Sequence, residues 1–273
     1  MKALWIALVP LLALPVAAQD NTGLNRLETR DQLRGWESVG RVDIDGGGFC
    51  TGALIAPDLV LTAAHCVFGP AGAAIDAGRI RFRAGLADGV AIAEAEVLRT
   101  VTPEGYRSPN AAPPDQLLLD VALLQLATPI PSSVAAPFTV ARPGVGDKVS
   151  VVSYAAGREE ALSWQRVCRV LGQQGGLVAV DCDVTFGSSG APVLDRSGYR
   201  AKIVSIISAG YKEDGRSVAF GMELPGIVDD LKARLRAGKV TSEAVGKAKA
   251  AQPGEKRITL GAGNDTGARF VKP

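Results

Sequence analysis

Short runs of apolar and β-branched residues alternate with turn residues along most of the chain. Gly, Pro and Asp break the runs, which is typical of the strands of a sandwich or barrel rather than of long helices. The pattern predicts six strands in the first half: Glu37–Asp43, Phe49–Ala56, Leu59–Ala63, Arg79–Ala84, Ala91–Thr100 and Val121–Leu126. It predicts six more in the second half: Lys148–Tyr154, Trp164–Leu171, Leu177–Val184, Ala191–Leu194, Ala201–Ala209 and Ser217–Glu223.

Two proline-rich stretches interrupt these strands. The first part of Glu104–Leu126 carries three prolines and predicts a long surface loop. Ala127–Val145 carries four prolines and few strand signals, which favours a linker between the two halves.

One helix is predicted near the C-terminus, in residues 224–235. Pro225 and Gly226 stand at its start, and Ile227, Leu231 and Leu235 recur one turn apart on one face. After Gly238 the composition turns to Ala, Gly and Lys, which predicts a loose tail.

The first residues have the layout of a secretory signal peptide. Lys2 is followed by the apolar run Ala3–Val16 and then by small residues ahead of Gln19. The run is too short and too interrupted by proline to favour a permanent span. We therefore expect cleavage after Ala18 and a secreted or periplasmic protein that no longer contacts the membrane.

Composition and charge exclude several classes of function. The 273 residues include 30 Lys and Arg against 28 Asp and Glu, a formal charge of +2, so we expect no nucleic-acid partner. The 47% of apolar residues exclude global disorder. Because His65 is the only histidine, a metal site with several histidine ligands is excluded, and we expect neither metal nor cofactor.

The chain contains four cysteines: Cys50, Cys66, Cys168 and Cys182. In an exported protein they predict two disulfides, and neither local gap has the two-residue spacing of a zinc or redox pair. The turn Ala56–Asp58 can bring the first two cysteines together. A hairpin folded about Gly175 places the last two opposite each other. We therefore predict the pairs 50–66 and 168–182.

Three motifs carry groups with acid–base or nucleophilic chemistry. His65 ends the apolar string LVLTAAHC, where a rigid strand can hold a general base. Asp120 opens DVALLQL, and a carboxylate turned inward there needs a partner such as a histidine N–H. Ser189 lies in FGSSGAPV, whose glycines allow backbone N–H groups to face one point. Each motif alone also fits an ordinary core histidine, turn carboxylate or Gly/Ser turn.

Together, in the order His, Asp, Ser, the motifs resemble those of chymotrypsin/trypsin-like serine peptidases. The corresponding strings are TAAHC at 62–66, DVALLQL at 120–126 and GSSGAP at 187–192, with FCTGALI at 49–55 upstream. The resemblance covers about Val39 to Leu235. It implies an all-β fold of two six-stranded antiparallel β-barrels with a C-terminal helix and the active site between the barrels.

The resemblance also implies a role for each site residue. Ser189 is expected to be the nucleophile, His65 its base, and Asp120 the group that orients His65. The backbone N–H groups of Gly187 and Ser189 are expected to form the oxyanion hole.

Three positions depart from the family pattern. Ser188 stands where trypsin-like zymogens place the Asp that binds a new N-terminus, so the chain resembles the bacterial glutamyl-endopeptidase-like branch that lacks this Asp. We therefore expect no activation by that switch. Ala191 replaces a usual Gly or Ser, and Thr185 stands where animal enzymes have a Cys.

Specificity is expected to depend on Asp183, which lies six residues before Ser189. At that position trypsin carries the Asp that binds Arg or Lys, although Asp181 competes if the loop differs in length. A Glu-specific pocket usually recruits a histidine of the second barrel, and this chain has none there. On the facing wall, Ser205 and Ser208 both fit the family's serine.

These interpretations predict an exported, monomeric serine endopeptidase that acts on polypeptides and favours Arg or Lys before the scissile bond. The alternative is a secreted binding protein of the same fold that has lost activity. The expected divisions are a signal peptide (1–18), an N-terminal segment (19–35), the first barrel (36–127), a linker (128–146), the second barrel with the helix (147–238) and a flexible tail (239–273).

Overall fold

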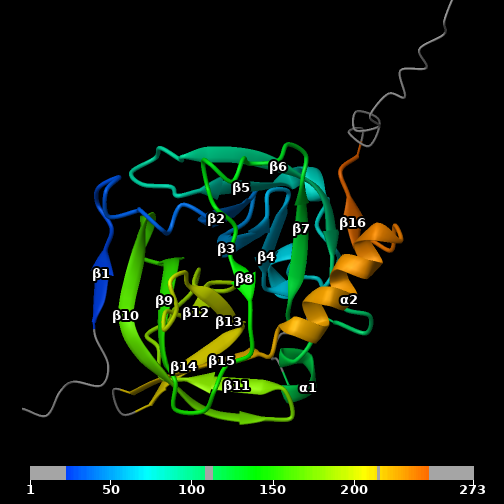
Figure 1. Cartoon of the computed structure of the whole chain (residues 1–273). Coiled ribbons are helices and arrows are strands. Elements are labelled where there is room, and N and C mark those ends of the chain that lie inside the picture. The colour runs from blue at the N-terminus through cyan, green and yellow to red at the C-terminus, as the bar shows by residue number, and fades with distance from the viewer. Residues whose placement is uncertain (1–22, 108–112, 214–215, 246–273) are drawn as a thin grey trace, which may run out of the picture.

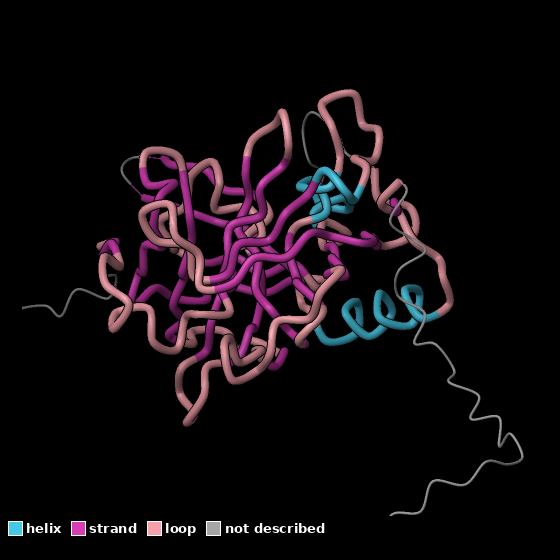
Figure 2. The backbone as a smooth tube through the Cα atoms, turned by 90° about the horizontal axis from the view of Figure 1, so that it is seen from above, coloured by secondary structure: helices cyan, strands magenta, loops and turns pink. Residues whose placement is uncertain are grey.

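The structure is a computed structural model of the chain, and it describes residues 23–107, 113–213 and 216–245. Within these ranges two β-sheets lie one above the other, with helix α2 (Pro225–Arg236) at one side (Figure 1). Seen from above, α2 lies beside the packed strands (Figure 2). The predicted signal peptide, residues 1–18, lies outside the described residues. Among the described helices, none is long and apolar enough to cross a membrane.

The first sheet is a closed antiparallel barrel with one added strand. Its order is β16-β6-β5-β2-β3-β4-β7, and pairing between β6 and β7 closes it. In β5 the alternation is clear, because Ile80, Phe82 and Ala84 are buried while Arg81 faces solvent. The six barrel strands are β2 (Val39–Ile44), β3 (Phe49–Ala56), β4 (Leu59–Thr62), β5 (Ile80–Ala84), β6 (Ala93–Val101) and β7 (Ala122–Leu126).

The second sheet has the order β14-β15-β11-β10-β9-β12-β13-β8. Two strands that are not neighbours in this order, β13 and β15, also contact each other. There Ser205 Oγ of β13 donates to the Met222 carbonyl of β15 at 3.0 Å. A Cβ at Gly221 would lie 2.0 Å from the Ile206 carbonyl, so this close approach requires glycine. The strands are β8 (Thr139–Val140), β9 (Lys148–Ala155), β10 (Arg158–Gln174), β11 (Leu177–Val180), β12 (Pro192–Asp195), β13 (Lys202–Ile206), β14 (Ala209–Glu213) and β15 (Arg216–Met222).

The predicted fold class is confirmed, and every predicted strand overlaps an observed one. The sequence pattern did not separate β14 from β13, because the apolar run continues through the bend between them. It also gave no signal for two short strands outside the barrels. These are β1 (Leu24–Arg26), which pairs with β10, and β8, which pairs in parallel with β13. Short helical turns are η1 (Ala64–Val67), η2 (Ala77–Arg79) and α1 (Pro114–Leu117).

The prediction that the flexible tail begins at residue 239 is wrong for its first residues. Strand β16 (Ser242–Glu243) pairs with β6, and the side chain of Thr241 bonds to Thr102 at 2.9 Å. Ala244 is only 3% exposed in the core of the first barrel. Thr241, Ser242 and Ala244 thus hold this segment against the first barrel, although its composition indicates a tail. The predicted tail beyond Val245 lies outside the described residues.

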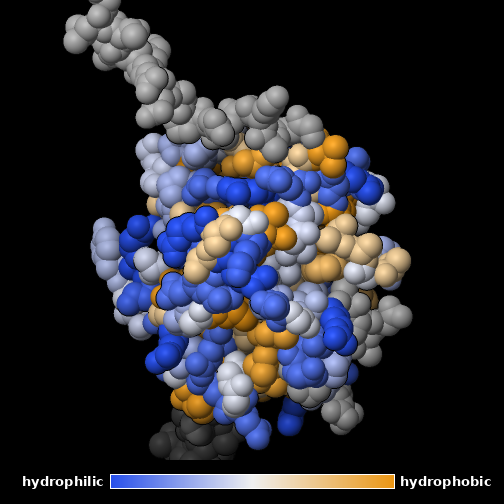
Figure 3. Space-filling model, turned by 90° about the vertical axis from the view of Figure 1, so that its right-hand side faces the viewer, coloured by the Kyte–Doolittle hydropathy of each residue, from blue (hydrophilic) through white to orange (hydrophobic). Residues whose placement is uncertain are grey.

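Helix α2 closes the fold on one side, as its apolar stripe predicts. Pro225 occupies the first helical turn, and Val228, Leu231 and Leu235 are buried. Ile227 is partly buried beside them. The surface on this side of the molecule is mostly hydrophilic, with hydrophobic residues in small separate areas (Figure 3).

One hydrophobic core joins the two sheets and α2. It includes Leu61 of β4, Tyr154 of β9, Ile206 of β13 and Leu231 of α2. The Tyr154 hydroxyl crosses between the sheets and donates to the Leu86 carbonyl at 3.0 Å. Because the sheets share this core, residues at their junction are held in fixed relative positions.

Candidate active site

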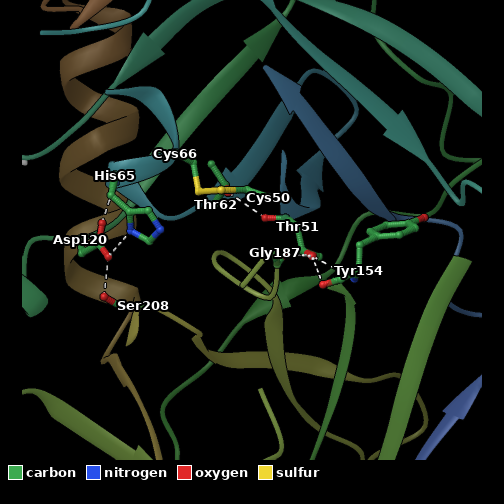
Figure 4. Close-up of a disulfide and its surroundings, with 9 residues drawn as sticks. All are labelled: Cys50, Thr51, Thr62, His65, Cys66, Asp120, Tyr154, Gly187 and Ser208. Carbon is green, nitrogen blue, oxygen red and sulfur yellow. Dashed lines mark hydrogen bonds and ion pairs between the residues drawn. A yellow bond between two sulfur atoms is a disulfide. The ribbon is translucent and has the colours of Figure 1, made fainter. Parts of the chain in front are cut away.

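His65 and Asp120 meet at the junction of the two sheets. His65 lies in η1, directly after β4, and Asp120 directly precedes β7, which pairs with β4. Asp120 Oδ2 lies 2.8 Å from His65 Nδ1, and Oδ1 accepts the His65 main-chain N–H at 2.8 Å. The Ser208 hydroxyl also donates to Asp120 Oδ2 (Figure 4). This resolves the choice left open by the sequence, since Ser208 faces the site while Ser205 bonds within the second sheet.

The carboxylate of Asp120 is kept ionised although it is only 4% exposed. Burial alone would raise its pKa, but the hydrogen bond and charge interaction with His65 and the bond from Ser208 together hold the pKa below its ordinary value. A buried negative charge beside Nδ1 favours the tautomer with hydrogen on Nδ1.

A disulfide fixes the corner that carries His65. Cys50 of β3 is bonded to Cys66, the residue after His65, and both are buried (Figure 4). The second disulfide joins Cys168 of β10 to Cys182, just after β11. These are the two pairs that the sequence predicts.

Ser189 lines the same cavity as His65. The cavity has a volume of about 580 Å³, and its wall also includes Phe186, Ile207, Tyr211 and Lys212. Within the described ranges, no hydrogen bond joins Ser189 Oγ to the His65 ring. In enzymes without bound substrate, catalytic hydrogen bonds are often long and tighten when substrate binds. The shared cavity places both side chains where one substrate can contact them.

Two backbone amides beside Ser189 are free to bind an anion. The Phe186 carbonyl accepts the Ala156 N–H at 2.7 Å, and the Ser188 carbonyl accepts the Ala191 N–H at 2.9 Å. These two carbonyls share their peptide groups with the N–H groups of Gly187 and Ser189. In a trans peptide the N–H points away from the carbonyl, so each N–H points away from the partner of its carbonyl. Neither amide donates to another group in the part of the chain that the structure describes.

Both glycines around Ser189 have conformations that other residues rarely adopt. Gly187 has φ +89° and Gly190 has φ +76°. A Cβ at Gly187 would lie 2.4 Å from the Phe49 ring, and one at Gly190 would lie 2.2 Å from Thr62 Oγ1. The loop therefore needs glycine at these positions for both its dihedral angles and its close approach to the first barrel.

Ser188 is neutral and fully buried in the same loop. Its hydroxyl lies 3.3 Å from Ser153 Oγ and accepts the Thr185 N–H at 3.4 Å. No charged group contacts it among the described residues. Ala191 is also fully buried, where a small side chain fits.

Asp183 lies near the cavity but is already paired. Ser217 Oγ donates to Asp183 Oδ1 at 2.5 Å, and Lys212 Nζ lies 3.4 Å from the same oxygen. Burial lowers the pKa of Arg158, and the charge of Asp183 opposes that shift, so a second cation lies near this carboxylate. Asp181 points elsewhere and accepts the Arg169 N–H at 2.5 Å. No local pattern in the sequence marks Lys212, because its contact with Asp183 depends on the pairing of β14 with β15.

One group of possible metal ligands lies beside the site. Among the described residues one group of three possible ligands is close enough for a metal, namely Cys50, His65 and Cys66. Both sulfurs are used by the disulfide, so no thiolate is available.

Comparisons with known proteins agree with the fold. A family model described as a trypsin-like peptidase domain matches residues 50–199. Among solved structures, that of a Glu endopeptidase in complex with MPD matches with a TM-score of 0.64 and 22% identity, over 79% of this chain and 97% of that chain. At that identity the likeness shows the fold. No curated protein matches the chain.

Proposed function

Since the chain belongs to the trypsin-like peptidase family, we propose that it is an exported serine endopeptidase that works through His65, Asp120 and Ser189. One observation carries this proposal. Asp120 contacts His65 at both its main-chain N–H and its ring, and His65 lines the same cavity as Ser189. Export rests on the predicted signal peptide in residues 1–18.

The proposed reaction begins with a peptide carbonyl seated beside Ser189. Ser189 Oγ attacks the carbonyl carbon while His65 Nε2 accepts its proton, and Asp120 stabilises the resulting imidazolium. His65 then protonates the leaving amine, so the peptide bond breaks and an acyl-enzyme remains. Water activated by His65 hydrolyses the ester and restores Ser189.

The negative oxygen of the tetrahedral intermediate is assigned to the N–H groups of Gly187 and Ser189. Among the described residues neither N–H donates to another acceptor. One such donor typically lowers the barrier by about 2.7–4 kcal/mol.

Primary specificity has two candidates with opposite charge. Asp183 supports Arg or Lys before the scissile bond, provided that Lys212, whose side chain is 64% exposed, moves off its carboxylate. Lys212 lines the cavity itself and favours an acidic residue before the scissile bond instead. The printed name of the similar structure, a Glu endopeptidase, points the same way. A panel of peptide amides differing only at this residue separates them. Preference for Glu that falls in Lys212→Ala assigns Lys212, and preference for Arg that falls in Asp183→Asn assigns Asp183.

The competing interpretation is a secreted binding protein on the same fold without activity. Labelling with a fluorophosphonate, followed by peptide mapping, tests the proposal directly. We expect one adduct, on Ser189, and none in Ser189→Ala. Folded protein that stays unlabelled at Ser189 would support the binding protein.

A further inference from the structure

Thr51 connects the first barrel to the loop that carries Ser189. It follows Cys50 on β3 and is fully buried at the junction of the sheets. Its main-chain N–H donates to the Ser189 carbonyl at 2.9 Å, and its carbonyl accepts the Thr62 hydroxyl at 2.8 Å. The backbone of Thr51 is therefore fixed on both sides.

The Thr51 hydroxyl makes two further bonds across the junction. It donates to the Gly187 carbonyl at 2.9 Å and accepts the Tyr154 N–H at 3.1 Å. The Tyr154 carbonyl is a second, longer acceptor at 3.4 Å. Figure 4 shows this one hydroxyl between Tyr154 of β9 and Gly187 of the loop that precedes β12.

These bonds act on Gly187, whose N–H donates to no other group among the described residues and which lies in the loop between Phe186 and Ser189, both of which line the cavity. Glycine rotates easily about its backbone bonds, so the direction of the Gly187 N–H depends on what holds the two neighbouring peptides. The Ala156 N–H holds the peptide before Gly187, through the Phe186 carbonyl. The Thr51 hydroxyl holds the peptide after it. By comparison, the hydroxyl of the buried Ser188 makes two longer contacts, of 3.3 and 3.4 Å.

We propose that Thr51 is a positioning residue, whose hydroxyl holds Gly187 so that its N–H is ready to bind the oxyanion. The proposal rests on the proposed function for its catalytic consequence. It assigns no contact with substrate to Thr51. A group of this kind affects the transition state more than substrate binding, because negative charge on the carbonyl oxygen develops only during attack.

The test replaces Thr51 with Val, which keeps the branched shape, and with Ser, which keeps the hydroxyl. Using the preferred peptide amide, we expect kcat to fall about tenfold to a hundredfold in Thr51→Val, as for loss of a buried hydrogen bond at the site. KM should stay within about twofold, and the pH profile should keep its shape, since His65 and Asp120 are untouched. Thr51→Ser should recover most of kcat.

Thr100→Val is the matched control for the loss of a buried hydroxyl. Thr100 is fully buried in the same barrel, and its hydroxyl bonds to Ser242 at 2.9 Å, away from the cavity. It should lower Tm without lowering kcat. If Thr51→Val does not fold, comparison of Thr51→Ser with Thr51→Ala isolates the hydroxyl, because both lack the methyl group.

A readout that needs no catalysis keeps this proposal separate from the proposed function. In ¹⁵N NMR spectra, the Gly187 amide should broaden or exchange faster with solvent in Thr51→Val than in wild type or Thr100→Val. An unchanged Gly187 amide, or wild-type kcat in a folded Thr51→Val protein, would overturn the role of Thr51. An unlabelled Ser189 in wild type would instead overturn the proposed function and leave the NMR result to decide on Thr51.

Discussion

Asp120 contacts His65 through both of its carboxylate oxygens. One oxygen accepts the main-chain N–H and the other faces Nδ1, each at 2.8 Å. Asp120 thus holds both the main chain and the ring of His65. This leaves Nε2 for the cavity that His65 and Ser189 line. His65 and Asp120 of the first barrel, together with Ser189 of the loop before β12, thus make up one candidate triad.

The bonds to Asp120 predict how stability depends on pH. Its pKa in the folded protein lies below the ordinary value of 3.8, so folding is favoured by the ionised form. This stabilisation is complete above the unfolded pKa and is lost as pH falls through the lower folded pKa. The difference in unfolding free energy between wild type and Asp120→Asn, measured by urea denaturation from pH 7 downward, should therefore shrink only below about pH 4. A difference that stays constant to pH 2 would contradict the assigned hydrogen bonds.

The two disulfides should differ in their effect on activity. Replacing either pair with Ala should lower stability by about 2–4 kcal/mol through a less restricted unfolded state. Loss of Cys50–Cys66 should also lower kcat/KM, because Cys66 neighbours His65, whereas loss of Cys168–Cys182 should lower it less. Denaturation and kinetics on both double variants check this. Equal kinetic effects, or a 66–168 peptide recovered from native protein under non-reducing conditions, would contradict it.

Gly190 should tolerate no side chain. A Cβ there would lie 2.2 Å from Thr62 Oγ1 and 2.3 Å from the Thr51 carbonyl, in addition to the strain of φ +76°. Gly146 is the matched control, because its φ is +81° but nothing lies within 4 Å of its Cβ position. Gly146→Ala should cost about 1–2 kcal/mol of stability from backbone strain alone. Gly190→Ala should cost more and also reduce Ser189 labelling, and comparable thermal stability of the two variants would refute the close approach.

Activity should not depend on which residue begins the mature chain. Ser188 is neutral and buried, so a charged N-terminus would find no acid beside it. Proteins beginning at Gln19, Asn21 and Asn25 should show the same active fraction by active-site titration, before and after mild proteolysis. Activity that arises only after cleavage near Arg30 or Arg34 would reveal a pro-segment.

Strands, disulfides and the triad candidates could be predicted because each has a local signal. Alternation marks the strands, turn spacing brings each pair of cysteines together, and motifs mark His65, Asp120 and Ser189. The bond between Thr51 and Gly187 joins residues 136 positions apart, so no local pattern reveals it. The same holds for Lys212 beside Asp183. It also holds for β16, whose short polar sequence pairs with the part of β6 that runs beyond β5.

The central claim is that His65 and Ser189 act as one unit in peptide hydrolysis. The measurement is kcat/KM for a peptide amide in wild type, His65→Ala, Ser189→Ala and the double variant. We predict that each single change lowers kcat/KM by several orders of magnitude and that the double variant is about as slow as either one, because proton transfer and attack are a single step. Near wild-type hydrolysis by His65→Ala, or losses that multiply in the double variant, would contradict the assignment.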